Sequence, residues 1–294
     1  MKRITFAILG AGRLGRALGR QLAGDPGLRP GGITARTRRS ARQAVSFIGG
    51  GEAHSSNARA AGGADLVIIA TPDRTIAPLA RELAGGGIKW ERKVVVHTSG
   101  ALSSSALEPL RRRGAQVASL HPLASIADSR STMTSFAGVP FAIEGDTAAV
   151  ILLRRVVARL RGVPVTIPRE AKALYHLIAC LLSNDLVALL SFGLATAESL
   201  GLRPKEAARL YLPLVRGTVE NVVRLGPVRA LTGPVSRGDV TTLRLHSEAL
   251  RGLPADLRKI HRLLALRSTA LALEARTITP EVAVRLARLV GSLP

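Results

Sequence analysis

Aromatic residues and cysteine are scarce in this sequence of 294 residues. Phenylalanine, tryptophan and tyrosine make up 3% of the chain, which leaves few side chains on which the bases of a nucleic acid could stack. The single cysteine, Cys180, excludes an intramolecular disulfide and favours a reducing, cytoplasmic location. Because Cys180 stands in an apolar run, we expect it to fill space in a core rather than to act as a nucleophile.

Acidic residues are also few. Lysine and arginine together number 42, aspartate and glutamate 20, and the formal net charge is +22. A chain this basic first suggests a nucleic-acid partner. Only six of the basic residues are lysines, however, and the arginines are spread along the chain rather than clustered. This distribution disfavours nucleic acid and favours a small, anionic molecule as the partner.

The sequence lacks histidine, cysteine, aspartate and glutamate groups at metal-ligand spacing, so it predicts no metal site. It also lacks a long, uninterrupted apolar run. The most apolar stretch, residues 173–200, contains one histidine, one asparagine and two acidic residues. These interruptions favour a buried helix over a membrane span, and we expect no membrane contact.

The clearest pattern lies in the first fifteen residues. Ile4 to Leu9 is an apolar run short enough for a strand buried on both faces of a parallel sheet, and residues 13–22 are compatible with a helix. Between them stand glycines at G-x-G-x-x-G spacing, the arrangement that holds a dinucleotide pyrophosphate at a helix N-terminus. The predicted cofactor-binding loop consists of Gly10, Ala11, Gly12, Arg13, Leu14 and Gly15. The alternative is a merely glycine-rich turn.

The end of the second strand distinguishes between the two nicotinamide dinucleotides. An NAD site carries an acidic residue there, which binds the ribose hydroxyls. Here the candidate strand at 32–35 runs into Arg36, Thr37 and Arg38, and no carboxylate is present. Guanidinium groups bind phosphate oxygens in bidentate fashion, so this set favours the 2′-phosphate of NADP(H). The alternative is a solvated basic loop.

Three further strand candidates, at 64–70, 92–96 and 116–120, end in polar residues. Ligands of open parallel sheets lie outside the carboxyl ends of the strands, so these polar ends are expected on one rim. Cofactor contacts are predicted for Thr71, Pro72, Asp73, His97, Thr98, Ser99 and Gly100, and a substrate contact for His121. Alternatively, His97 bonds only to backbone and His121 orders its own loop.

The order of the predicted elements indicates two domains. An α/β domain with a Rossmann-like parallel sheet is expected over residues 1–168, closing with strands at 140–143 and 164–167. An all-α domain is expected over 169–294, with helices at 171–200, 205–224, 241–250, 255–275 and 280–290. These long apolar helices predict a homodimer formed through the helical domain. Residues 123–138 are a long polar loop, either a lid or a disordered excursion.

Polar residues interrupt the first apolar helix of the second domain. On an unbroken helix Lys172, His176 and Ser183 share a face, with Asn184 at its margin. Burying these groups is costly unless something polar meets them, which favours a catalytic role toward a carboxylated substrate. The alternative places Lys172 at an exposed first turn and makes His176 a satisfied core residue. Further along, Thr232 and Arg237 are predicted to bind the substrate, or else merely belong to a connector between helices.

Taken together, the glycine loop, the polar strand ends, Lys172 to His176, Asn184 and residues 232–239 resemble a known family. Its members are predicted oxidoreductases with an N-terminal Rossmann-like domain and a C-terminal helical domain of unknown function. The first half also resembles deazaflavin-dependent NADP oxidoreductases and pyrroline-5-carboxylate reductases. The Lys172–Asn184 helix is similar to that of β-hydroxyacid dehydrogenases and ketopantoate reductases, although their lysine and asparagine are four residues apart and His176 holds that position here.

The resemblance implies an NADP(H)-dependent oxidoreductase that reduces a carbonyl or imine of a small, carboxylated substrate between the domains. Lys172 would donate the proton or polarise the carbonyl, with His176 as the second candidate, and Asn184 would orient the substrate. The alternative function is a non-catalytic NADP(H)-binding sensor or scaffold.

Overall fold

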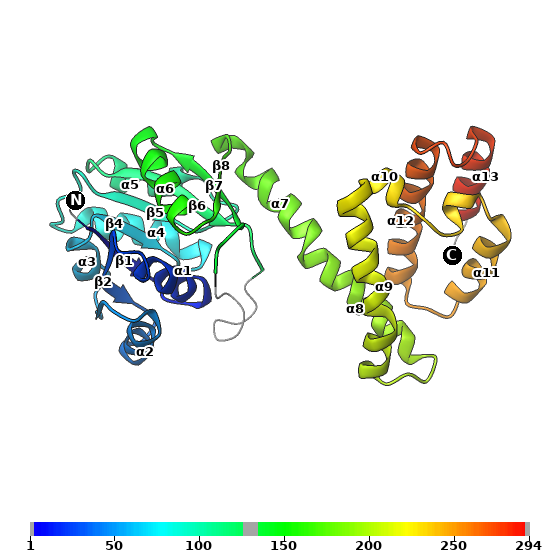
Figure 1. Ribbon diagram of the computed structural model, residues 1–294, viewed down its shortest axis with the longest axis horizontal. Helices are drawn as coiled ribbons and strands as arrows, with labels where there is room; N and C mark the ends of the chain where they lie inside the picture. Colours follow the sequence, from blue (N-terminus) through cyan, green and yellow to red (C-terminus); the bar gives the residue numbers. More distant parts are fainter. Residues whose placement is uncertain (1–2, 126–134, 292–294) are drawn as a thin grey trace. The chain divides into compact units, whose positions relative to one another are not determined.

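The computed structural model describes residues 3–125 and 135–291, and Figure 1 shows the path of the chain. The chain divides into two compact units, Met1–Asn184 and Asp185–Pro294. The domain boundary expected after residue 168 stays a prediction, and the first compact unit continues beyond that point to the end of helix α7 (Lys172–Leu182). Most of the loop at 123–138, predicted as a lid or an excursion, lies outside the described residues.

One sheet of eight strands forms the centre of the first unit. The strands are β1 (Ile4–Leu9), β2 (Leu28–Thr34), β3 (Glu52–Ala53), β4 (Leu66–Ile69), β5 (Val94–His97), β6 (Gln116–Pro122), β7 (Pro140–Gly145) and β8 (Val163–Thr166). Their order across the sheet is β3-β2-β1-β4-β5-β6-β7-β8, and all neighbours are parallel except β6 and β7. This is the predicted α/β Rossmann-like sheet, extended by two strands of opposite direction.

Helices cover both faces of the sheet. The core on one face is shared with α1 (Arg13–Ala23), α2 (Arg38–Ile48) and α6 (Thr147–Arg159). The core on the other face is shared with α3 (Asn57–Gly62), α4 (Asp73–Gly85), the 3-10 turn η1 (Ser104–Leu107) and α5 (Glu108–Arg111). Covering on both sides buries the central strands completely, as the apolar runs predict.

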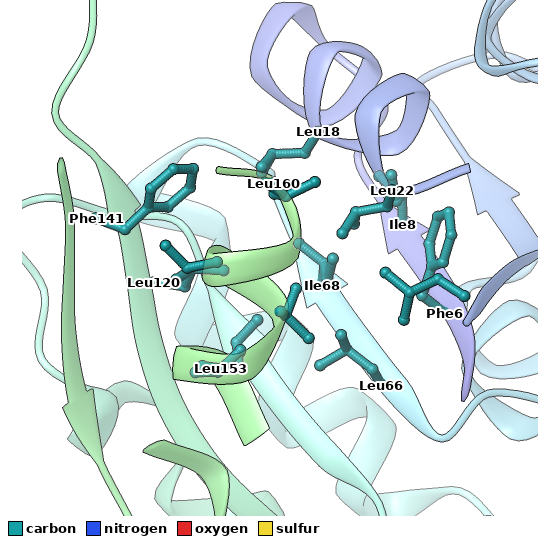
Figure 2. Packing of buried hydrophobic residues seen from close by; sticks show 14 of the residues in the cluster. Phe6, Ile8, Leu18, Leu22, Leu66, Ile68, Leu120, Phe141, Leu153 and Leu160 are labelled. Atoms are coloured by element: carbon teal, nitrogen blue, oxygen red, sulfur yellow. The ribbon is translucent and has the colours of Figure 1, made fainter. Parts of the chain in front are cut away.

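Strand β1 shows how the sequence pattern produces this burial. Successive side chains of a strand point to opposite faces, so its residues divide between the two cores. Phe6 and Ile8 pack beneath α1, where Figure 2 shows them beside Leu22. Ala7 and Leu9 belong to the core on the opposite face. The glycine loop that follows β1 is therefore anchored at its start by side chains on both faces of the sheet.

The long helix predicted over 171–200 is in fact two helices. A 3-10 turn, η2 (Arg169–Ala171), leads into α7, which ends at Ser183, and α8 (Asn184–Glu198) begins at the next residue. Ser183 has left the helical region (φ −125°, ψ −70°). The prediction that Ser183 continues the face of Lys172 and His176 is wrong, because the rotation of 100° per residue does not carry across this break.

The second unit is helical, as expected. Besides α8 it contains α9 (Pro204–Leu225), α10 (Pro227–Ala230), the turn η3 (Val235–Arg237), α11 (Val240–Leu250), α12 (Ala255–Glu274) and α13 (Pro280–Gly291). One small core joins α11, α12 and α13. In contrast, the 22 residues of α9 bury only Ala207, and α8 buries only Ala197. These two helices thus leave most of their apolar side chains exposed within one chain.

The segment Arg169–Glu198 contains an 18-residue window with a mean hydropathy of 2.0, as a membrane span would, and is the one such candidate among the described residues. Length and hydropathy alone are weak evidence for a membrane span, because a helix that packs against protein can have both. Contrary to the expected burial, however, none of its apolar window is buried within the chain. Leu174, Leu177 and Leu181 of α7 are among its exposed side chains.

Candidate functional site

A cavity of about 1360 Å³ opens at the carboxyl ends of the parallel strands. Its walls come entirely from the first unit. They include the glycine loop, the end of β2, the start of α4, the turn after β5 and two histidines. The predicted site residues that line it are Gly10, Ala11, Gly12, Arg13, Leu14, Arg36, Thr37, Thr71, Pro72, Asp73, Thr98, Ser99, Gly100, His121 and His176.

Glycine suits the three positions of the loop for three different structural reasons. Gly10 adopts a left-handed conformation (φ +91°), which a side chain would strain, and it lies against Thr71. A Cβ on Gly15 would meet the Gly10 carbonyl oxygen at 2.7 Å, so this glycine lets α1 pack closely on β1. A Cβ on Gly12 would have no described atom within 4 Å. The space above Gly12 is therefore open for a ligand to approach the backbone.

Helix α1 directs its N-terminus at this space. Gly12 is its N-cap, and among the described residues no side chain caps the helix and no acidic residue stands in its first turn. Its positive dipole end is thus left uncompensated by carboxylates of the helix, which is the arrangement that binds anions. The glycine loop and the helix together form an anion-binding cradle at one end of the cavity.

Thr34 at the end of β2 holds the loop in place. Its carbonyl oxygen accepts hydrogen bonds from the N–H groups of Gly10 (3.2 Å) and Ala11 (2.8 Å). Its hydroxyl donates to Oδ1 of Asn57, at 2.7 Å. Arg16 adds a second brace, because its Nε donates to the Ala11 carbonyl oxygen at 3.1 Å. Asn57 and Arg16 both line the cavity, and the sequence analysis singled out neither of them.

The basic segment after β2 lies beside this cradle. Arg36 and Thr37 line the cavity, together with Ser40. Thr37 is the N-cap of α2, and its hydroxyl accepts from the N–H of Ser40 at 3.1 Å. Arg38 is exposed in the first turn of α2 and is not part of the cavity wall. A contact between Arg38 and a cofactor stays a prediction.

The ends of β4 and β5 form the opposite wall. Ser99 donates from its hydroxyl to Oδ2 of Asp73, at 2.7 Å, and accepts from the N–H of Leu102 at 2.9 Å. This arrangement fixes Asp73 at the start of α4. Thr71 differs from these residues, because its buried hydroxyl has no hydrogen-bond partner among the described residues. An unpaired buried hydroxyl on a cavity wall is suited to a polar ligand atom.

His97 is fully buried and does not line the cavity. The N–H of Ser99 donates to its Nδ1 at 3.2 Å, so Nε2 carries the proton and lies 3.0 Å from the Ser103 carbonyl oxygen. Burial lowers its pKa, and the ring therefore stays neutral. The structure thus shows His97 holding the turn after β5, and a contact between His97 and a cofactor stays a prediction.

Lys172 is 2% exposed, which rules out the alternative of an exposed first turn. Its Nζ donates to the Ser99 carbonyl oxygen and to Oγ of Ser119, both at 2.8 Å. Burial lowers the pKa of Lys172 to about 8, against the opposing effect of Glu144 and Asp73. Lys172 does not line the cavity. Its charge therefore lies directly behind the cavity wall that Ser99 forms.

Two histidines, His121 and His176, line the cavity, and Tyr175 contacts the first of them. Nδ1 of His121 lies 2.9 Å from the hydroxyl of Tyr175, and the two rings meet edge to face. The His121 and His176 rings are 6.1 Å apart. Both rings lie over Gly100, where a Cβ would overlap Cδ2 of His176 and approach Nε2 of His121 to 3.0 Å. Glycine at position 100 thus makes room for both imidazoles.

The inward face of α7 supplies this cluster. Lys172, Tyr175 and His176 are buried or half-buried, in agreement with the shared face predicted for Lys172 and His176. Cys180 continues the face one turn later, half-buried, with its Sγ 3.8 Å from Nδ1 of His176. No pattern in the sequence indicates Tyr175 as a residue of the site. Only the hydrogen bond to His121, a residue distant in the chain, identifies it.

The predicted residues Asn184, Thr232 and Arg237 are likewise not part of this cavity. Asn184 is exposed at the start of α8. Thr232 and Arg237 belong to the second unit, where both are exposed and Arg237 ends η3. Their roles toward a substrate stay predictions. Among the described residues no cluster of histidine, cysteine and acidic side chains could hold a metal ion.

Comparison with family models identifies the two parts of the chain. Residues 1–122 match the model described as a Rossmann-like domain. Residues 139–268 match DUF2520, a domain of unknown function. The chain therefore joins a Rossmann-like domain to a DUF2520 domain. The DUF2520 match begins at β7, so it includes strands β7 and β8 as well as most of the helices of the second unit. No curated protein matches the sequence significantly.

Solved structures share this architecture over nearly the whole chain. A Bacteroides fragilis protein, provisionally named an NADP oxidoreductase, has a TM-score of 0.72 at 24% identity and covers 92% of this chain and 98% of its own. A reductive aminase from Aspergillus terreus, in complex with NADPH and ethyl-5-oxohexanoate, has a TM-score of 0.61 at 20% identity, with coverages of 99% and 93%. A pyrroline carboxylate reductase from Plasmodium falciparum with NADP bound has a TM-score of 0.58 at 14% identity, with 99% of each chain covered. At these identities the likeness shows the fold, as the family resemblance implies.

Proposed function

We propose that this chain is an NADP(H)-dependent oxidoreductase that reduces a carbonyl or imine of a small, carboxylated substrate. The observation that carries the proposal is one continuous cavity, with an anion cradle at Gly12 and the His121–His176 pair among its walls. The solved structures of the same fold that contain NADP or NADPH support this cofactor.

The residues present fit a dinucleotide phosphate. The open space at Gly12 would admit a pyrophosphate to the N-terminus of α1, and the unpaired Thr71 hydroxyl offers a polar contact beside it. Arg36 and Thr37 lie where an extra phosphate on the adenosine would need cations and hydroxyls. No acidic residue occupies the corresponding positions from 35 to 40.

When bound, NADPH would supply the hydride. We assign Lys172 an electrostatic role, because its buried ammonium stabilises negative charge that develops on the substrate oxygen or nitrogen. His121 and His176 orient the reacting group from the cavity wall.

A screen of NADPH oxidation over 2-oxo acids, ketopantoate and cyclic imines tests the activity. Turnover with one of these classes, faster with NADPH than with NADH, is the expected result. Tight NADPH binding without turnover of any 2-oxo acid or cyclic imine would indicate the alternative, a non-catalytic sensor or scaffold. Binding of nucleic acid that weakens steeply with salt, with no effect of NADPH on melting, would contradict both.

A valine at position 12 tests the cradle directly. Because a Cβ at Gly12 meets no described atom, Gly12→Val should fold normally yet block the approach of the pyrophosphate. The dissociation constant for NADPH should rise at least about 100-fold, while the melting temperature of the free protein stays unchanged. Gly85→Ala is the matched control, since a Cβ there also meets nothing within 4 Å but lies at the end of α4, outside the cavity wall. An unchanged affinity in Gly12→Val would contradict the site.

The exposed apolar helices support the predicted homodimer. Leu177 and Leu181 of α7 are each 52% exposed, and Val223 of α9 is 82% exposed. Apolar surface of this extent is usually covered by protein, and we propose that a second copy covers it. Light scattering should give a mass of about twice 30.9 kDa, falling to the single-chain mass in a Leu177→Glu, Leu181→Glu variant. Co-sedimentation of the wild type with vesicles would instead favour a membrane partner.

A further inference from the structure

Tyr175 of α7 and His121 of β6 are joined by a hydrogen bond between their side chains. The Tyr175 hydroxyl lies 2.9 Å from Nδ1 of His121. The opposite edge of the imidazole, which carries Nε2, approaches Gly100 on the cavity wall. The two ring nitrogens thus have different surroundings: Nδ1 lies beside a phenol, and Nε2 lies beside Gly100, which lines the cavity together with His121.

We propose that Tyr175 and His121 are a proton relay, in which His121 gives the Nε2 proton to the substrate while Nδ1 takes the proton of the Tyr175 hydroxyl. This inference rests on the proposed reductase function and assigns its proton source. Lys172 was the first candidate for that role from the sequence, but its ammonium lies behind the wall. His121 itself lines the cavity, so under this proposal it is the residue that contacts the substrate.

The transfer balances in protons and electrons. Hydride arrival at the carbonyl or imine carbon moves the π-electron pair to the oxygen or nitrogen. That atom takes the proton of His121 Nε2, and the lone pair on Nδ1 takes the proton of the Tyr175 hydroxyl. His121 ends in its other neutral tautomer, and a phenolate remains on Tyr175. A proton from water then restores Tyr175, and the return of His121 to its first tautomer completes the cycle.

The charges around the pair favour this sequence. Lys172 Nζ lies 5.6 Å from the centre of the Tyr175 ring, where its cation stabilises a phenolate. Burial acts in the opposite direction: it raises the pKa of Tyr175 to about 12, so the hydroxyl is protonated before the reaction and a free phenolate is disfavoured. A relay also avoids an imidazolate, which a lone neutral histidine would become on giving up its proton.

The groups that face His121 keep its ring neutral at physiological pH. Burial, followed by the cation of Lys172 and the neighbouring His176, lowers the pKa of His121 to about 4. Asp73 opposes this effect, and His97 adds a small contribution in the same direction as Lys172. A neutral ring has one donor and one acceptor, which is what a relay between a phenol and a substrate requires.

The tautomer of His121 can be read without any substrate. In protein with ¹⁵N-labelled histidine, long-range ¹H–¹⁵N spectra at pH 7 separate a protonated ring nitrogen from an unprotonated one, and His121→Gln assigns the signal among six histidines. We expect Nε2 protonated and Nδ1 unprotonated in the wild type. In Tyr175→Phe the Nδ1 resonance should move because its hydrogen-bond donor is gone. A wild-type His121 with its proton on Nδ1 would overturn the relay.

Enzyme kinetics provide a second test of the relay. Tyr175→Phe should lower kcat by about 10²-fold or more, as expected when a positioned proton donor is lost, with the NADPH dissociation constant unchanged. The chain offers a matched control in Tyr211→Phe, because Tyr211 is the only other tyrosine and lies in the second unit. His121→Gln keeps an N–H donor but cannot pass a proton, so its kcat should fall with that of Tyr175→Phe.

The outcomes separate the two proposals. Wild-type turnover that survives in Tyr175→Phe overturns the relay and leaves the reductase function standing. NADPH binding without turnover of any substrate class overturns the reductase function, and the relay with it. Turnover that falls in both Tyr175→Phe and His121→Gln, together with an Nε2-protonated His121, supports both.

Discussion

Replacement of Lys172 by methionine is expected to lower kcat by about 10²–10³-fold, the loss typical when one preorganised electrostatic contact is removed. Methionine keeps most of the side-chain volume and removes the ammonium that Ser99 and Ser119 hold in place. The dissociation constant for NADPH should stay the same, because Lys172 lies outside the cavity wall. Steady-state kinetics with the substrate found in the screen, together with an NADPH titration, measure both quantities.

Lys93→Met is the control for this variant. Lys93 is a second lysine that donates to backbone, to the carbonyl oxygens of Gly62 and Ala64, and it is not part of the cavity. Its replacement removes a hydrogen-bonded ammonium from the same unit without touching the site, so kcat should be unaffected. Equal losses in both variants would show that Lys172 acts through stability alone.

The pKa of Lys172 gives the same prediction a pH dependence. If the ammonium form is the active one, kcat should decline as the pH rises through about 8. Since burial holds the folded-state pKa of Lys172 below its ordinary value of 10.5, the unfolded chain binds more protons between about pH 8 and 10.5. The free energy of unfolding therefore receives a contribution that rises with pH in this window. Denaturant titrations should show this rise in the wild type and its loss in Lys172→Met.

Removal of the guanidinium groups at Arg36 and Arg38 is expected to weaken NADPH binding by about tenfold for each arginine. A hydrogen bond to a charged group contributes about 1.5–3 kcal/mol, and the exposure of both side chains places the effect at the lower end. NADH lacks the 2′-phosphate, so its dissociation constant should not change. The double variant Arg36→Ala, Arg38→Ala should thus bring the two cofactors to similar affinities.

Arg42→Ala serves as the matched control for the arginine variants. Arg42 is exposed on α2, one turn beyond Arg38, and it lies outside the cavity wall. Its loss changes the net charge by the same amount, so a nonspecific effect of charge would appear equally in this variant. Tighter binding of NADH than of NADPH by the wild type would contradict the assignment of Arg36 and Arg38.

The sequence predicted the glycine loop well because local rules determine it. Gly10 needs a left-handed turn, Gly15 needs close packing, and both requirements are visible in the spacing between one strand and one helix. The buried strands were predictable for a similar reason, since covering on two faces produces continuous apolar runs. By contrast, the two residues of β3 and the short helix α3 are too brief to produce a periodic pattern.

The parts of the site that the sequence could not predict depend on contacts between distant residues. Asn57 joins the glycine loop through Thr34, 23 residues away, and Tyr175 joins His121, 54 residues away. The burial of Lys172 was equally hidden, because its partners Ser99 and Ser119 come from two other elements. The end of α7 at Ser183 was missed because neither proline nor glycine marks the break between the apolar residues of α7 and those of α8.

The first compact unit ends at Asn184, after α7 rather than before it. The dinucleotide cradle, the buried lysine and the histidine–tyrosine pair therefore belong to one continuous piece of chain. A chimera that joins this piece to the helical unit of another protein would therefore carry all three groups together. The covalent continuity of the chain from Met1 to Asn184 thus keeps these groups in one piece whatever helical unit follows them.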